Sequence, residues 1–251
     1  MTSMPEAGRA DNDQRERALE IITLSVDDGR AAEDGGATRL EVVRDIQEDG
    51  LTPSRELVEQ LLNRVSIPLR VMVRPRNTFV VDDAAHRDEI ARDAARFADL
   101  PVDIVTGYVR AAADGSSALD IEALALVAER LPTARITVHR AIERVTVGPA
   151  AALWQCGQVD RVLSGGGGGA WEVRARALEA LQASIAPVRV VVGGGVTPEA
   201  IEVLATRPSL RELHVGRIAR EGESYHQPVS AAAVASLARR WFSSGTGSRQ
   251  A

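Results

Sequence analysis

The sequence predicts a single (β/α)8 barrel of the TIM type, in which eight parallel strands close into a ring and a helix follows each strand. Three observations predict it. Short β-branched runs alternate eight times with longer amphipathic stretches. No change in composition divides the 251 residues, and that length suits one barrel of this class. A doubly wound open sheet is the alternative with the same alternation.

The predicted elements follow one another as strand and helix throughout. We expect strands at 18–24, 39–44, 69–74, 102–107, 135–140, 159–164, 188–193 and 212–216. The helices that follow them are expected at 26–35, 53–64, 84–99, 118–130, 148–156, 170–184, 197–206 and 230–242. Thr52-Pro53 and Thr197-Pro198 mark two helix starts, because threonine caps a helix and proline at the first helical position needs no amide proton. The barrel domain therefore covers 18–242, between solvated tails at 1–17 and 243–251.

The overall composition is that of a globular protein with a sizeable core. Hydrophobic residues make up 45% of the chain and charged residues 26%. No apolar run approaches the roughly 20 residues that a membrane helix needs, and the start of the chain lacks the apolar segment of a secretory signal. We therefore expect a cytoplasmic protein without a membrane partner. The formal charge of −5, with no basic block, argues against a nucleic-acid partner.

Rare and missing residue types exclude several kinds of chemistry. All 30 basic residues are arginine, which excludes Schiff-base catalysis, attachment of pyridoxal phosphate and a P-loop lysine. The single cysteine, Cys156, excludes an intrachain disulfide and any site that needs two thiolates from one chain. The sequence also lacks the GxSxG, HExxH and CxxC motifs and a dinucleotide-binding fingerprint.

Polar and glycine residues near the ends of the predicted strands indicate a cavity at one mouth of the barrel. Alternate residues of a barrel strand face inward, and this fold places its chemistry at the C-terminal strand ends. The inward positions are Glu20, Glu41, Arg74, Thr106, His139, Ser164, Gly193 and His214. Buried carboxylates require partners, and we expect Arg74, His139 and His214 to pair with the two glutamates. This ring is either a functional cavity or a structural ion-pair network.

Five members of the ring are candidate catalytic residues, namely Glu20, Glu41, Arg74, His139 and His214. Histidine can act as a general acid or base near neutral pH. Guanidinium groups can hold a carboxylate or phosphate with two hydrogen bonds, and we expect Arg74 to be the anchor.

Glycine-rich segments after the last three strands indicate an anion site. Glycines let the backbone approach a ligand and leave amides free at a helix start, and barrel phosphate sites are often built after strands seven and eight. The alternative is that these glycines only permit tight turns or a mobile lid. The candidate substrate- and anion-binding residues are Arg76, Thr106, Ser164, Gly165, Gly166, Gly167, Gly194, Gly195, Gly216 and Arg217.

Short motifs at the strand ends occur in a characteristic order. They are Leu19-Glu20-Ile21, Arg39-Leu40-Glu41-Val42, Asp49-Gly50-Leu51-Thr52-Pro53-Ser54, Val73-Arg74-Pro75-Arg76, Val105-Thr106-Gly107, Thr137-Val138-His139-Arg140-Ala141, Arg161-Val162-Leu163-Ser164-Gly165 and Gly193-Gly194-Gly195-Val196. Together they resemble the CutC copper homeostasis family over about residues 18 to 242. The resemblance implies a TIM-type barrel in the cytosol, a homo-oligomer such as a dimer, and copper(I) binding.

The resemblance also implies where copper ligands would lie. Family members commonly carry cysteines where this chain has Ile22, Thr23 and Val43. Copper(I) prefers thiolate and thioether ligands, which these three residues do not provide. The carboxylate, arginine and histidine groups that remain suit acid–base chemistry or a hard divalent ion.

Two functions of different class follow. The first, implied by the resemblance, is a copper homeostasis protein that binds or moves the metal without catalysis. The second is an enzyme, a lyase or isomerase that acts on a small anionic metabolite such as a phosphorylated one, by acid–base chemistry or with a divalent metal. In the second, the glycine segments and Arg217 hold the anion, Arg74 orients a carboxylate or carbonyl, and His139 moves a proton with Glu41 or Glu20.

Overall fold

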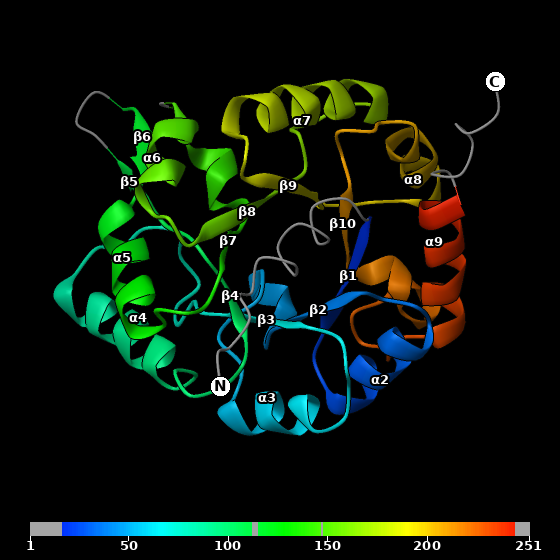
Figure 1. Cartoon of the computed structure of the whole chain (residues 1–251), viewed down its shortest axis with the longest axis horizontal. Coiled ribbons are helices and arrows are strands. Elements are labelled where there is room, and N and C mark those ends of the chain that lie inside the picture. The colour runs from blue at the N-terminus through cyan, green and yellow to red at the C-terminus, as the bar shows by residue number, and fades with distance from the viewer. Residues whose placement is uncertain (1–16, 112–114, 147, 244–251) are drawn as a thin grey trace, which may run out of the picture.

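A computed structural model confirms the predicted barrel over the residues that it describes, 17–111, 115–146 and 148–243. Eight parallel strands close in the order β1-β10-β9-β8-β7-β4-β3-β2, and the helices surround them (Figure 1). The strands are β1 Ala18–Thr23, β2 Arg39–Val42, β3 Leu69–Met72, β4 Asp103–Thr106, β7 Ile136–Val138, β8 Val159–Ser164, β9 Arg189–Val192 and β10 Glu212–Val215. Because β1 pairs with β10, with Glu20 opposite His214, the open-sheet alternative is wrong.

A helix follows each barrel strand, as predicted. The helices are α2 Val26–Asp34, α3 Arg55–Leu62, α4 Ala84–Ala95, α5 Ile121–Arg130, α6 Pro149–Gln155, α7 Trp171–Ile185, α8 Pro198–Ala205 and α9 Ala231–Ser243. Short 3-10 turns follow three of the strands, at Ile46–Glu48, Arg140–Arg144 and Arg217–Ala219. Among the residues described, no helix is both long enough and apolar enough to cross a bilayer.

The sequence predictions differ from the structure at the connection before α5 and at the N-terminal boundary of the barrel. A small antiparallel hairpin, β5 Val109–Ala111 and β6 Ser117–Leu119, precedes α5, where a helix was expected from residue 118. Three-residue strands are too short to display a period of two. Arg17, expected in a tail, donates to the carbonyls of Trp241 and Ala205. The remaining tail residues, 1–16 and 244–251, lie outside the described part of the chain.

Polar residues before the helices explain most of the helix starts. The side chain of Thr197 accepts the amide of Ala200 at the start of α8, as predicted. Thr52 does not cap a helix, because α3 starts later and Ser54 caps it. The Thr52 hydroxyl instead accepts the amide of Arg74, which ties the loop after β2 to the end of β3.

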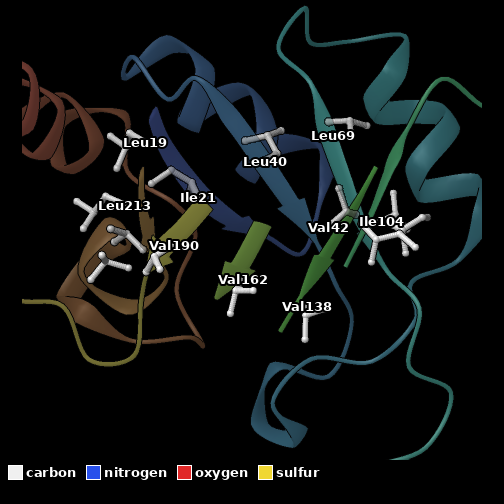
Figure 2. Close-up of a cluster of buried hydrophobic side chains, with 14 of the residues drawn as sticks. Leu19, Ile21, Leu40, Val42, Leu69, Ile104, Val138, Val162, Val190 and Leu213 are labelled. Atoms are coloured by element: carbon white, nitrogen blue, oxygen red, sulfur yellow. The ribbon is translucent and has the colours of Figure 1, made fainter. Parts of the chain in front are cut away.

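Alternating strand residues build two different layers. Figure 2 shows residues from the barrel strands that belong to the buried core between strands and helices, namely Leu19, Ile21, Leu40, Val42, Leu69, Ile104, Val138, Val162, Val190 and Leu213. Because side chains of a strand alternate between its faces, the residues between these positions face the barrel interior. In β1, β2 and β10, the interior positions therefore include the charged or imidazole groups Glu20, Arg39, Glu41, Glu212 and His214, together with the apolar Ile22 near the end of β1.

Candidate functional site

A pocket of about 550 Å³ opens at the C-terminal ends of the strands. Its inner wall includes the predicted site residues Glu41, His139 and His214 beside Ile22 and Met72. Most of its rim is formed by the loops after β7, β9 and β10, which carry Arg140, Glu143, Arg144, Gly194, Gly195, Gly216, Arg217 and Tyr225, and the loop after β2 adds Asp49. The structure therefore brings together three of the five candidate catalytic residues at the predicted mouth.

His214 lies between two carboxylates at the inner wall. Its Nδ1 atom is 2.8 Å from Glu20 Oε1, and its Nε2 atom is 3.6 Å from Glu41 Oε2. The register of β1 against β10 places Glu20 directly opposite His214. All three side chains are at most 7% exposed, so solvent screens their interaction weakly.

Glu20 is held as a carboxylate by a partner that the sequence analysis missed. Arg39 donates from Nε to Glu20 Oε2, and β2 places Arg39 opposite Glu20 in register. Burial raises the pKa of Glu20, but the charge of Arg39 and the contact with His214 outweigh burial and hold it well below its usual range. Glu20 therefore fixes the His214 ring and does not carry a proton near neutral pH.

Glu41 is the carboxyl that titrates near neutral pH. Burial raises its pKa to about 7 against the opposing charge of His214, and the nearby negative charge of Glu20 adds to the rise. Burial lowers the pKa of His214, but the charge of Glu41 and the contact with Glu20 outweigh it and leave that pKa raised. Glu41 can therefore give or take a proton at the wall of the pocket.

His139 is a neutral donor and does not pair with either glutamate as expected. Its Nδ1 atom accepts the amide of Ala141 at 3.1 Å, which places the ring proton on Nε2. Burial, with the positive charge of Arg74, lowers its pKa to about 3. Its Nε2 atom has no hydrogen-bond partner among the described residues. His139 can therefore donate a hydrogen bond to a ligand, but it is not a base near neutral pH.

Arg74 does not reach the carboxylates, contrary to the expected pairing. Its guanidinium donates to the carbonyls of Glu48 and Gly50 at 2.7 and 2.8 Å and to Asn77 Oδ1 at 2.7 Å. Strand β3 ends at Met72, so the alternation used to aim Arg74 inward no longer applies at its position. Arg74 is absent from the described lining of the pocket, and it instead ties the loop after β2 to the loop after β3.

Phe79 connects Arg74 to the pocket wall. The guanidiniums of Arg74 and Arg144 lie 4.6 and 4.4 Å from the Phe79 ring centroid, and His139 meets that ring edge-on at 5.1 Å. Cations over an aromatic face are attracted by its quadrupole. Arg74 therefore positions Phe79 beside His139. Arg76 forms ion pairs with Glu89 and Asp83 and is not part of the described lining.

The first glycine segment is not open to the pocket, unlike the two that follow. Glu143 Oε1 accepts the amide of Gly165 at 2.6 Å, and Ser164 Oγ accepts that of Gly166 at 3.1 Å. Of the anion-binding candidates, the described lining includes only Gly194, Gly195, Gly216 and Arg217; it does not include Thr106, Ser164, Gly165, Gly166 and Gly167. Thr106 donates to the carbonyl of Val73, which is a structural contact within the barrel.

The rim of the pocket is rich in arginine, which the sequence analysis missed apart from Arg217. Arg140, Arg144 and Arg217 line it together with two carboxylates, Glu143 and Asp49. Arg140 pairs with Glu143, whereas Arg217 forms no ion pair with the residues in the described part of the chain. The inner wall therefore carries the proton chemistry and the rim carries net positive charge.

Below the pocket, a buried charge network fills the barrel interior. Glu212 accepts from Arg39 at 2.8 Å, from Arg161 at 2.7 Å and from Arg189 at 3.3 Å. The alternation that identified Glu20 and Glu41 could also have identified Arg39 and Glu212, because they lie two residues from Glu41 and His214 on the same strands. Of the predicted ring of inward residues, Glu41, His139 and His214 therefore line the cavity, whereas Glu20 belongs to the structural ion-pair network.

The side chains at the three positions where the resemblance places cysteines are a poor donor set for copper(I). Ile22, Val43, Met72 and Val105 form an apolar cluster, so two of these three positions hold aliphatic side chains beside one thioether. The third, Thr23, carries a hydroxyl that donates to the carbonyl of Ile21. Cys156, on the loop after α6, does not line the described pocket. No group of three or more His, Cys, Asp or Glu residues within the described ranges could hold a metal ion. The residues present therefore do not fit a copper(I) thiolate site.

Comparison with known proteins identifies relatives and fold neighbours. The profile of the CutC family matches residues 18–219. A protein of Xanthomonas campestris pv. campestris (strain 8004) named as a family protein CutC is 32% identical over 219 residues, covering 84% of this chain and 87% of that protein. One of the same name from Serratia proteamaculans (strain 568) is 33% identical over 181 residues, covering 71% of this chain and 70% of that protein.

Solved structures support the same architecture. A Streptococcus agalactiae structure, named as a copper homeostasis protein CutC, aligns with a TM-score of 0.68 at 22% identity, covering 80% of this chain and 98% of that chain. A thiamine phosphate pyrophosphorylase from Pyrococcus furiosus aligns with a TM-score of 0.55 at 16% identity, covering 94% and 100%. These structural likenesses concern the fold alone. With a profile match over most of the barrel and relatives above 30% identity, the chain belongs to the CutC family.

Proposed function

We propose that this chain is an acid–base enzyme, an isomerase or lyase, acting on a small anionic molecule in the rim pocket. The observation that carries the proposal is Glu41, a carboxyl 4% exposed at the pocket wall. Its closest charged neighbour is the imidazole of His214 at 3.6 Å, and no arginine forms an ion pair with it among the described residues. A carboxyl that is buried, faces a cavity and has no cationic clamp is suited to proton transfer.

The neighbours of Glu41 assign the supporting roles. His214 faces Glu41 through Nε2, at 3.6 Å, and contacts Glu20 through Nδ1, at 2.8 Å. Glu20 is fixed in turn by Arg39. This arrangement holds the imidazole in one orientation and favours its charged form when Glu41 has lost its proton. Glu20 and Arg39 are therefore positioning residues, and Glu41 carries the transferred proton.

His139 would supply a neutral donor to the ligand. Its Nε2–H group lacks an acceptor among the described residues, and its ring lines the same pocket as Glu41. A neutral imidazole donates to a carbonyl or oxyanion without adding full positive charge. A substrate with a carbonyl or hydroxyl oxygen near the proton to be moved would fit this pair.

The rim would hold the anionic end of the molecule. Arg140, Arg144 and Arg217 line it beside the backbone of Gly194 and Gly195. Guanidinium groups bind phosphate and carboxylate with charge-assisted hydrogen bonds, and the two glycines follow β9, one of the strands after which barrel phosphate sites are built. The molecule would therefore lie with its anion at the rim and its reacting atoms at the inner wall.

A ligand screen followed by substitution tests this function. We expect a phosphorylated or carboxylated metabolite to raise the melting temperature, since ligand at about 100 times its Kd adds about 2.7 kcal/mol of stability. With a turned-over compound in hand, Glu41→Gln should lower kcat by about 10² to 10⁴ and leave ligand binding intact. Glu129→Gln, at a carboxylate 67% exposed on α5, is the matched control and should change neither.

Two outcomes would contradict this function. One is a screen in which none of the anions shifts the melt, and the other is full activity of Glu41→Gln. Copper(I), added anaerobically in the same screen, tests the copper homeostasis function that the family name suggests. We expect no stabilising shift, because Ile22 and Val43 provide no thiolate. Stoichiometric copper(I) binding that survives a chelator would instead favour the copper function.

A further inference from the structure

The carboxylate of Glu143 is surrounded by hydrogen-bond donors of the kind that bind phosphate. Its Oε1 atom accepts from the amide of Gly165 at 2.6 Å and from the hydroxyl of Ser164 at 3.4 Å. Its Oε2 atom accepts from Nε of Arg140 at 2.9 Å. A backbone amide, a hydroxyl and a guanidinium form a typical donor set for an oxyanion. We call these three donors the oxyanion cradle.

A second arginine, Arg174, fixes the loop that carries the Gly165 amide. Arg174 donates from Nε to the carbonyl of Gly165 at 2.6 Å and from Nη2 to the carbonyl of Gly194 at 2.7 Å. These bonds fix the loops after β8 and β9 against each other and leave the Gly165 amide directed at Glu143. The cradle therefore has two guanidiniums nearby and one carboxylate, so removing that carboxylate would leave two positive charges without their counterion.

Glycine at position 165 is required for this close approach. A Cβ atom there would lie 2.9 Å from Arg174 Nη2, 3.0 Å from the carbonyl oxygen of Gly193 and 3.3 Å from Glu143 Oε1. Such contacts are tighter than real side chains tolerate unless neighbours move. The glycine lets the loop close tightly around a carboxylate.

The cradle lies directly behind the pocket. Glu143 and Arg140 line the pocket, together with Gly194, whereas Ser164 and Gly165 are absent from its described lining and lie behind the Glu143 carboxylate. The Arg140 guanidinium carbon is 3.8 Å from the Cβ position of Gly194. If the Glu143 side chain turned away, the Gly165 amide and the Ser164 hydroxyl would become accessible from the pocket.

We propose that Glu143 is an internal competitor that occupies an oxyanion site, and that a phosphate or carboxylate group of the ligand displaces it. The carboxylate presents the same oxygens and the same charge sign to the cradle as the ligand would. Binding then exchanges one anion for another and releases Glu143 toward the rim. The identity of the molecule that carries the anion rests on the proposed function. The existence of the anion site does not, because it is argued from the oxyanion cradle alone.

Titration with inorganic phosphate, followed by calorimetry at fixed ionic strength, tests the proposal on the full chain. Glu143→Ala empties the cradle and should bind phosphate at least 10-fold more tightly than the unmodified protein. Glu143→Gln removes the charge but keeps an acceptor for the Gly165 amide, so its gain should be smaller. Glu172→Ala, in the first turn of α7, makes the same change in net charge without emptying the cradle and should leave phosphate binding unchanged.

Two further titrations distinguish binding in the cradle from binding elsewhere. Arg140→Ala placed in the Glu143→Ala protein should abolish the gain, and acetate should show the same order of variants as phosphate if the cradle accepts carboxylates as well. Phosphate binding by Glu143→Ala that is no tighter than in the unmodified protein or in Glu172→Ala would overturn the proposal. If Glu143→Ala does not fold, equal binding by Glu143→Gln and the unmodified protein would overturn it. None of these titrations involves turnover, so they do not depend on the role of Glu41.

Discussion

Replacing Glu212 by glutamine is expected to lower the free energy of unfolding by about 3–5 kcal/mol, because a buried ion network that loses one partner leaves uncompensated charge. Glu212 is 1% exposed and accepts hydrogen bonds from Arg39, Arg161 and Arg189. Glutamine keeps one acceptor oxygen but removes the negative charge that these three guanidiniums share. Urea denaturation at pH 7 measures the loss.

The pH dependence of this loss has a defined sign. Burial raises the pKa of Glu212, but Arg39 and Arg161 outweigh it and lower the pKa to about 2. The folded carboxylate therefore contributes stability above about pH 4.5, which is lost as the pH falls toward 2. The difference between Glu212→Gln and the unmodified protein should shrink over that range. Glu202→Gln, at an exposed pair with Arg240, should change stability by less than about 1 kcal/mol.

A Glu212→Gln protein within 1 kcal/mol of the unmodified one at pH 7 would contradict this account of the barrel interior. It would mean that the three arginines find other partners without loss. The consequence would reach the pocket, because Arg39 also fixes Glu20 and through it His214.

Glu41→Gln is expected to stabilise the protein, and increasingly so as the pH rises from about 5 to 8. The pKa of Glu41 is raised to about 7 in the folded state, mainly by burial. The folded protein therefore holds this proton more tightly than the unfolded chain does, and folding is penalised once the carboxyl must ionise. The rise from 4.5 to about 7, at about 1.4 kcal/mol for each unit of pKa, gives an expected gain on the order of 3–4 kcal/mol above pH 7.

Comparison of the two proteins at each pH isolates the combined effect of Glu41 and His214, because the charge of Glu41 also raises the pKa of His214. The pKa of His139 is lowered to about 3, so its contribution is lost as the pH falls from 6.5 toward 3, in the opposite sense. His139 is present in both proteins and cancels in the difference. Chemical denaturation of both proteins from pH 5 to pH 8 measures the effect. A difference that stays constant with pH, or a less stable variant at pH 8, would show that Glu41 is ionised and well solvated.

The sequence alone was sufficient for the barrel and for part of the site. Glu41 and His214 could be placed at one mouth because each lies inside a strand, where alternation fixes the face and strand order fixes the neighbours. The position of Arg74 could not be predicted in this way, because it lies two residues beyond the end of β3. Its side-chain orientation depends on loop carbonyls that it contacts. His139 was found at the pocket, but its neutral state depends on the Ala141 amide and on burial, which a sequence does not show.

Most of the predicted anion-binding residues lie in loops, where the sequence pattern does not determine the contacts. The run of glycines predicted that Gly165–Gly167 bind an anion. In the structure, the Glu143 carboxylate, in the loop after β7, accepts the Gly165 amide instead. Loop conformation decides such contacts, and no periodicity describes loops. Arg140 and Arg144 were passed over for the same reason, since they lie in a 3-10 turn after β7.

The most direct test of the central claim, that a carboxyl in the rim pocket transfers protons near neutral pH, is titration of Glu41 by carboxyl ¹³C nuclear magnetic resonance, with Glu41→Gln identifying the signal. The account predicts a midpoint of about 7. A midpoint near the ordinary glutamate value of about 4.3 would contradict it, because Glu41 would then be an ordinary ionised side chain.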